Sequence, residues 1–169
     1  MRRSVLALVA TLVLAGCGQG ADSIDNAAGD RLETASIAAG LVADPAAVPL
    51  DGMWSRDTDR MCILPRGAKD GDPVRRIGVV LDYGEGQGCV ASGTLERSGA
   101  ELKVALGACR FTARFDGDSI QFPAGLPTEC NTLCTGRATL SALIVERIST
   151  SVAEARTLRS PGGKALCVD

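Results

Sequence analysis

The cysteines are the residues most able to do chemistry in this chain, because the sequence contains seven cysteines and no histidine. Without an imidazole, the chain cannot build the usual Ser-His-Asp or Cys-His nucleophilic sites, or a zinc site that relies on histidine. Thiolates could bind a metal, but no second close pair accompanies Cys130 and Cys134, and the Cys-x-x-Cys motif that favours redox chemistry is not present. The sequence therefore predicts no catalytic residue, no metal site and no cofactor.

Paired carboxylates are a second possible source of chemistry. Asp57 and Asp59 form one pair, and Asp70 and Asp72 form another. Such pairs can bind calcium or act in glycoside hydrolysis. Neither pair completes a calcium-binding loop, however, and arginine or lysine flanks each of them. The favoured interpretation is two solvated loops, so an enzyme that works with carboxylates alone ranks behind the non-enzymatic interpretations.

Two further motifs could bind an anion. The glycine-rich segment 83–88 has the composition of a phosphate-binding loop, but such a loop precedes a helix, whereas a strand is predicted here. The glycines are therefore predicted to supply turn geometry. Arg75 and Arg76, together with Arg110 and Arg114, could form a small basic patch. The favoured interpretation of these arginines is the solvated face of a sheet.

The N-terminus has the parts of an export signal. Residues 1–3 form a basic region, residues 4–15 form an apolar run, and small residues precede Cys17. The apolar run is shorter than the ~20 residues that a membrane-spanning helix requires. Residues 1–16 are therefore predicted to be a removable signal peptide.

The tetrapeptide Leu14-Ala15-Gly16-Cys17 resembles the lipobox of bacterial lipoproteins at every position. This resemblance implies that the Cys17 sulfur receives a diacylglyceryl group and that the signal is cleaved before it. It also implies acylation of the new amino end, with palmitate as the expected fatty acid. The acyl chains would anchor the protein stably, since each buried methylene contributes ~0.8 kcal/mol. The family's sorting rules retain proteins with Asp at the next position in the inner membrane, so Gly18 implies the periplasmic face of the outer membrane.

Composition limits the possible partners of the mature chain. Cleavage removes two of the 18 basic residues and leaves 16 against 20 acidic residues, a net charge of −4. Such a balance argues against a nucleic-acid-binding surface, which needs clustered lysine and arginine. Residues 17–50 are predicted to be the lipidated cysteine and a tether, with a loosely docked helix or disorder over 22–41 and an extended spacer over 43–49. Residues 51–169 are predicted to form one envelope domain.

The domain shows the alternating pattern of antiparallel strands with one solvated face. The sequence predicts a mainly β fold, an antiparallel meander that closes into a small barrel or sandwich, with one C-terminal helix. Strands are predicted at 77–81, 89–97, 100–106, 109–115, 119–122, 138–147 and 164–168, with turns at Ser98-Gly99 and Asp116-Gly117 and a helix over 152–159 that begins with a capping box at Ser151.

Six cysteines remain after Cys17 is set aside, and an even number in an exported domain predicts three disulfides. A turn at Ser98-Gly99 would place Arg97 opposite Ala100 and Cys89 opposite the residue before Cys109, which favours a bridge between these two cysteines. Fifteen pairings are possible in principle. The favoured set is Cys89–Cys109, Cys130–Cys134 and Cys62–Cys167.

A second resemblance concerns the start of the domain. The sequence Gly-Met-Trp at 52–54, followed by Cys-Ile-Leu at 62–64, resembles the opening of the small β-barrel inhibitors that bacteria keep in the periplasm against secreted metalloproteases. In that family a flexible N-terminal segment enters the protease cleft, and residues 18–50 would be the corresponding segment here. Acylation of Cys17 would leave this segment without a free amino end.

These observations favour a membrane-anchored envelope lipoprotein that is a non-catalytic binding or structural module. The alternative is a periplasmic inhibitor of a protease or another hydrolase. The predicted partners are the lipid bilayer, through the acyl chains on Cys17, and an envelope protein or cell-wall component, with no nucleic acid.

Overall fold

The computed structural model describes residues 27–67 and 73–168. The predicted signal peptide and Cys17 lie outside the described residues. So does the predicted carboxylate pair of Asp70 and Asp72.

The described chain forms two compact units, which divide between Val42 and Ala43. The first unit contains helix α1 (Ala27–Ala38), inside the range where a helix or disorder is expected. The helix is followed by Gly40, whose φ of +68° is a left-handed conformation that favours glycine. Leu32, one of the few large apolar side chains of α1, is 71% exposed. None of the helices among the described residues is long and apolar enough to cross a bilayer.

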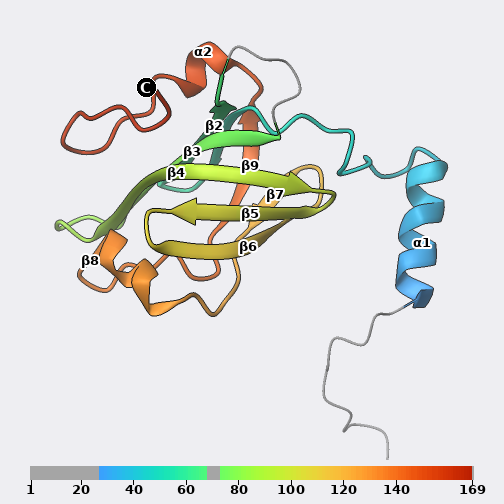
Figure 1. Ribbon diagram of the computed structural model, residues 1–169, viewed down its shortest axis with the longest axis horizontal. Helices are drawn as coiled ribbons and strands as arrows, with labels where there is room; N and C mark the ends of the chain where they lie inside the picture. The colour runs from blue at the N-terminus through green and yellow to red at the C-terminus, as the bar shows by residue number, and fades with distance from the viewer. Residues whose placement is uncertain (1–26, 68–72, 169) are drawn as a thin grey trace, which may run out of the picture. The chain divides into compact units, whose positions relative to one another are not determined.

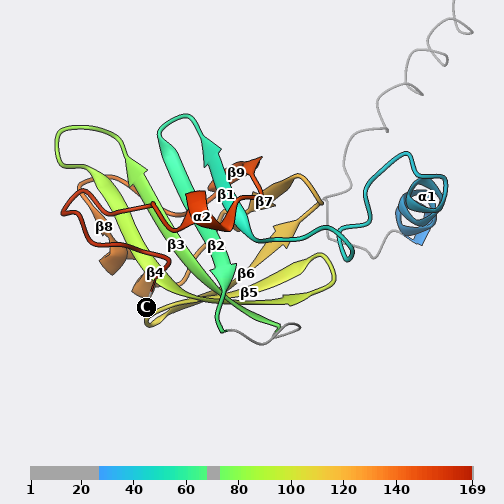
Figure 2. The same ribbon diagram turned by 90° about the horizontal axis from the view of Figure 1, so that it is seen from above.

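The second unit is a closed antiparallel β-barrel (Figures 1 and 2). Its strands are β1 (Gly52–Arg56), β2 (Asp59–Pro65), β3 (Val74–Asp82), β4 (Gly88–Ser98), β5 (Glu101–Leu106), β6 (Cys109–Phe115), β7 (Ser119–Gln121), β8 (Cys134–Thr135) and β9 (Ile144–Ser149). Strands β1 to β7 follow one another around the barrel, and β9 closes it between β7 and β1. Strand β8 lies outside this ring and pairs with β4. The predicted mainly β, antiparallel and disulfide-stapled fold is therefore confirmed, and it is a barrel.

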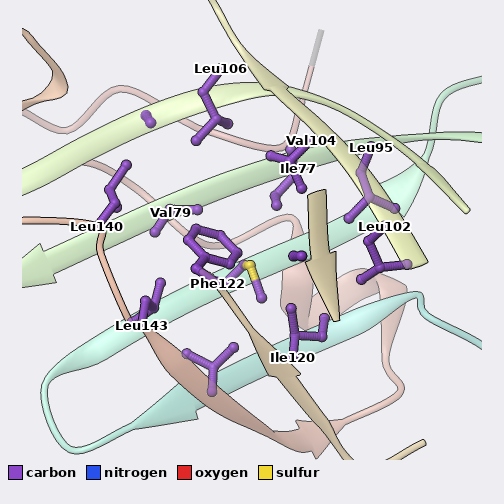
Figure 3. Packing of buried hydrophobic residues seen from close by; sticks show 14 of the residues in the cluster. Ile77, Val79, Leu95, Leu102, Val104, Leu106, Ile120, Phe122, Leu140 and Leu143 are labelled. Atoms are coloured by element: carbon purple, nitrogen blue, oxygen red, sulfur yellow. The ribbon is translucent and has the colours of Figure 1, made fainter. Parts of the chain in front are cut away.

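The barrel interior is filled by the apolar side chains that alternate along the strands. In β5, Leu102, Val104 and Leu106 are buried, whereas Glu101 and Lys103 are exposed, as the period-two pattern predicts. Figure 3 shows these three apolar side chains with those of the neighbouring strands and of the segment before β9. Four of the five aromatic rings pack edge to face in two pairs, with centroids 5.8 Å apart for Trp54 and Phe115 and 4.6 Å apart for Phe111 and Phe122.

A second, smaller apolar cluster lies on the outside of β1, β2 and β3. The chain after β9 covers this face, beginning with helix α2 (Val152–Ala155). Gly78 of β3 allows the close approach, because a Cβ at this position would lie 2.6 Å from the Leu166 Cβ atom. The predicted Cys62–Cys167 disulfide is confirmed, and it fixes the end of the chain to β2.

Three predicted element bounds near the C-terminus are wrong. Helix α2 ends at Ala155, well short of residue 159, although Ser151 caps it as expected by accepting a hydrogen bond from the Glu154 amide at 3.2 Å. Residues 164–168 form no strand, and Arg159 makes an isolated bridge with Ala165 there. The apolar run 138–147 is a strand only from Ile144 onward. In the first two cases the chain follows the barrel's outer surface and is held by side-chain packing, which does not require a regular backbone.

The other two predicted disulfides, Cys89–Cys109 and Cys130–Cys134, are wrong. The structure pairs Cys89 with Cys134 and Cys109 with Cys130. The turn between β4 and β5 places Ser98 opposite Glu101, which shifts the expected register by two residues. This shift alone would place Cys89 opposite Arg110, which is still beside Cys109, so the first error has another cause.

The cause is that the first residues of β4 are not paired with β5, so Cys89 has no partner residue on that strand. The pairing of these strands stops at Thr94 and Ala105, and a Cβ on Gly93 would lie 1.9 Å from the Ala105 carbonyl oxygen. Beyond this point β4 continues beside β3 and β8, which places Cys89 directly opposite Cys134. The path of β4 past the last β5 partner therefore decides the pairing.

Residues 43–50, called the strap below, are held against one end of the barrel. The Arg97 guanidinium donates a 2.7 Å hydrogen bond to the Val48 carbonyl, and Arg147 donates to the Pro49 carbonyl. Each guanidinium also lies over an aromatic ring, at 5.2 Å from the Phe115 centroid and 4.4 Å from the Trp54 centroid. The compact unit of the barrel thus begins at Ala43, ahead of the expected domain start at residue 51.

Candidate functional site

A hollow of about 510 Å³, called the loop pocket below, lies at the barrel end where β3 and β4 are joined. Three segments that are far apart in sequence form it: the β3–β4 loop, β8 with the residue before it, and the C-terminal loop. In Figures 1 and 2 these segments lie at the same end of the barrel. The apolar lining residues are Leu81, Val90, Leu133 and Pro161, and the polar ones are Asp82, Glu85, Gln87 and Thr135, with Gly84, Gly86 and Gly88 between them.

The β3–β4 loop has a tightly defined backbone. Its three central residues, Gly84, Glu85 and Gly86, have φ values of +77°, +52° and +74°. Two of these positions suit glycine, while Glu85 adopts a conformation that costs a non-glycine residue ~1–2 kcal/mol. The Tyr83 amide donates to the Gln87 carbonyl at 2.9 Å and closes the loop. The glycines therefore supply turn geometry, as the sequence indicates.

Strand β8 is tied to this loop by side chains. The Thr135 hydroxyl donates to the Gly86 carbonyl at 2.7 Å and lies 3.3 Å from the Gly88 amide, which donates to it. The Cys89–Cys134 disulfide joins the adjacent residues of β4 and β8. The two walls of the loop pocket are consequently held together before any ligand arrives.

The rim of the loop pocket is acidic. Asp82 and Glu85 are exposed, and no lysine or arginine is among the described residues that line the hollow. The neighbouring Tyr83 side chain is 53% exposed, and its pKa is raised by partial burial and by the negative charge of Asp59. Partial burial also raises the pKa of the Asp59 carboxyl, with a further contribution from the negative charge of Asp57.

Apart from the glycine-rich loop, the described residues singled out as possible anion-binding or acidic sites do not line the loop pocket. Asp57 lies in the turn between β1 and β2, with a φ of +51°. Arg75 forms an ion pair with Asp51, with 3.0 Å between Nε and Oδ1. Arg110 and Arg114 project outward from β6, as expected, and they line two separate hollows of about 510 Å³ and 310 Å³. No group of three or more potential metal ligands occurs in the described part of the chain.

Sequence reasoning identified the glycine-rich loop but not the pocket that it borders. Leu133 and Pro161 carry no local signal, because they reach the pocket only through the Cys89–Cys134 pairing and the path of the C-terminal segment. A correct pairing of Cys89 would have placed Leu133 and Thr135 beside the loop.

Fold and geometry define a disulfide-stapled, eight-stranded antiparallel barrel with an apolar pocket at the β3–β4 end. Residues 1–17 match the family model of the prokaryotic membrane lipoprotein lipid attachment site. The chain is thus a bacterial lipoprotein precursor, anchored in the cell envelope by lipid. No curated protein and no solved structure matches the chain, and the family of the mature domain is not recognised.

Proposed function

We propose that this lipoprotein is a non-catalytic binding module and that its binding site is the loop pocket. The observation that carries the proposal is a preformed apolar hollow of about 510 Å³, within the ~300–1,000 Å³ typical of small-molecule sites. The Cys89–Cys134 disulfide and Thr135 hold its walls in place. Such preorganisation lowers the ordering cost of binding.

The groups around the loop pocket support binding rather than catalysis. Thr135 supplies the one hydroxyl among the lining residues, and its oxygen is already engaged with the backbone of Gly86 and Gly88. Asp82 accepts a hydrogen bond from the Gly84 amide at 3.0 Å, so this carboxylate has a structural role in the loop. A nucleophilic site would need a free nucleophile held beside a base.

The lipid anchor would present this module in the envelope. Gly18, where a family member retained in the inner membrane would carry Asp, supports the periplasmic face of the outer membrane as its location. Fractionation of inner and outer membranes, with the Gly18→Asp variant as the comparison, tests this location. Recovery of the unaltered protein in the inner membrane would contradict it.

Binding of a neutral apolar fluorescent dye, N-phenyl-1-naphthylamine, tests the proposal. The protein is residues 17–169 with Cys17→Ser, so that acyl chains do not compete for the dye. Val90→Trp should fill the pocket and abolish saturable binding, because Val90 lines it. Ile148→Trp is the matched control, since Ile148 is a similarly exposed apolar residue on β9 that does not line this pocket.

Saturable binding that only Val90→Trp removes supports the loop pocket as the site. Absence of binding, or equal loss in the two variants, would overturn it. The inhibitor alternative draws support from the small closed barrel, as in the family that the sequence at 52–54 resembles. Its cleft-inserting segment would have to precede the strap, which is bonded to the barrel. Stoichiometric inhibition of a secreted metalloprotease by the same protein, unaffected by Val90→Trp, would favour that alternative.

A further inference from the structure

We infer that the ligand of the loop pocket is a small, soluble amphiphile with an apolar body and a positively charged head. This inference rests on the proposed binding function and specifies the chemistry of the ligand. It depends on three features of the site: an apolar lining, an acidic rim, and a loop in which the amides of Gly84, Gln87 and Gly88 are already engaged.

The apolar body would lie against the hydrophobic part of the lining. Val90, Leu133 and Pro161 come from three different segments and supply this apolar lining, whereas Leu81 is only 1% exposed and belongs to the barrel core. Val90 is 37% exposed although it is a large apolar residue, which leaves apolar surface available to a ligand. Covering such surface is favourable in proportion to the area removed from water.

The positive charge of the ligand's head group is inferred from the acidic residues at the rim of the loop pocket. Asp82 and Glu85 are the charged residues of the lining, and both are acidic. A carboxylate or phosphate head would be repelled by two like charges, whereas an ammonium head would be attracted.

The loop backbone also disfavours an anionic head. An anion in a glycine-rich loop is normally bound by free backbone amides. Here the Gly84 amide donates to Asp82 and the Gln87 amide donates to the Gly84 carbonyl. The Gly88 amide donates to Thr135. These three loop amides are therefore engaged, and the loop presents acidic side chains instead.

The test compares three competitors that share one alkyl chain, all used below their micelle-forming concentrations. Decylammonium, decanol and decanoate each displace the neutral dye from the mature chain with Cys17→Ser. Decylammonium should bind about tenfold more tightly than decanoate at low salt, which corresponds to ~1.4 kcal/mol. The preference should shrink as the salt concentration rises, because exposed charges are screened.

The combined Asp82→Asn and Glu85→Gln variant should remove the preference for decylammonium and leave the affinity for the neutral dye unchanged. The asparagine oxygen can still accept the Gly84 hydrogen bond, so the loop should remain intact. Glu101→Gln is the matched control, because Glu101 is an exposed carboxylate in the β4–β5 hairpin, outside the pocket lining. It should leave the preference as it is.

The two proposals fail in distinguishable ways. If the neutral dye does not bind, the proposed binding function is wrong, and this inference falls with it. If the dye binds but decanoate competes as well as decylammonium, only the inference is wrong. A preference that survives Asp82→Asn with Glu85→Gln, or binding of a basic peptide in place of decylammonium, would also overturn it.

Discussion

Of the three disulfides, Cys62–Cys167 should be the one whose removal lowers the free energy of unfolding of this domain most. The bridge joins residues 105 positions apart, whereas Cys109 and Cys130 are 21 positions apart. On a chain-entropy estimate, the longer loop constrains the unfolded chain by about 4.7 kcal/mol and the shorter one by about 3.3 kcal/mol. Since domains of this kind have ~5–15 kcal/mol of stability, the double substitution to alanine would remove a large fraction of it.

Removal of this disulfide should also loosen the C-terminal segment locally, in addition to lowering the stability of the whole domain. Cys167 is the covalent link that keeps the C-terminal segment on β2, where Leu166 packs against Gly78 in the outer cluster. The Leu166 amide donates to the Leu158 carbonyl at 3.1 Å. Without the disulfide, this amide should lose its protection from hydrogen exchange before the amides of the barrel strands do.

Denaturant unfolding and native-state hydrogen exchange test both parts. The variant Cys62→Ala with Cys167→Ala is compared with the matched variant Cys109→Ala with Cys130→Ala. The reasoning is refuted if the first variant is at least as stable as the second. It is also refuted if the Leu166 amide keeps the protection that it has in the unaltered protein.

Three other predictions address the anchor, the strap and one turn. Cys17→Ser in the precursor should leave the signal uncleaved and should prevent incorporation of labelled fatty acid. Arg147→Lys should lower the free energy of unfolding by ~1–2 kcal/mol and expose the strap to limited proteolysis, because lysine cannot both stack on a ring and donate a forked pair of hydrogen bonds. Burial raises the pKa of Asp116, but hydrogen bonds from Ser119 and Asp118 outweigh it and hold the pKa below its ordinary value. Its contribution to stability is therefore complete above ~pH 4 and is lost as the pH falls through the lowered pKa, so Asp116→Asn should show a weaker acid dependence of the melting temperature.

The features that sequence reasoning recovered are those with a local cause. Strand β6 follows from the alternation of apolar and charged residues over 109–115, and the next turn follows from Asp116-Gly117. Gly117 has a φ of +110°, and Asp116 accepts from the Ser119 amide at 2.6 Å. Such signals need no knowledge of distant residues.

The features that sequence reasoning missed depend on which strands meet. Cys89 bonds to Cys134 because β4 runs past β5 and reaches β8, and no local pattern in the sequence shows where the β4–β5 pairing stops. In the same way, Leu133 and Pro161 enter the loop pocket from segments whose positions are set by the Cys89–Cys134 pairing and by the path of the C-terminal segment. The candidate site is therefore a product of topology, whereas the lipid attachment site is a contiguous motif that can be read directly.

The strap gives the anchored protein a mechanical property. The lipid holds the first residue of the mature chain, so any pull between membrane and barrel travels along the chain and reaches the strap before β1. Arg97 on β4 and Arg147 on β9 donate hydrogen bonds to carbonyl oxygens of the strap. We therefore expect a force applied through the lipid anchor to be shared between β4 and β9 before it acts on the hydrogen bonds of β1.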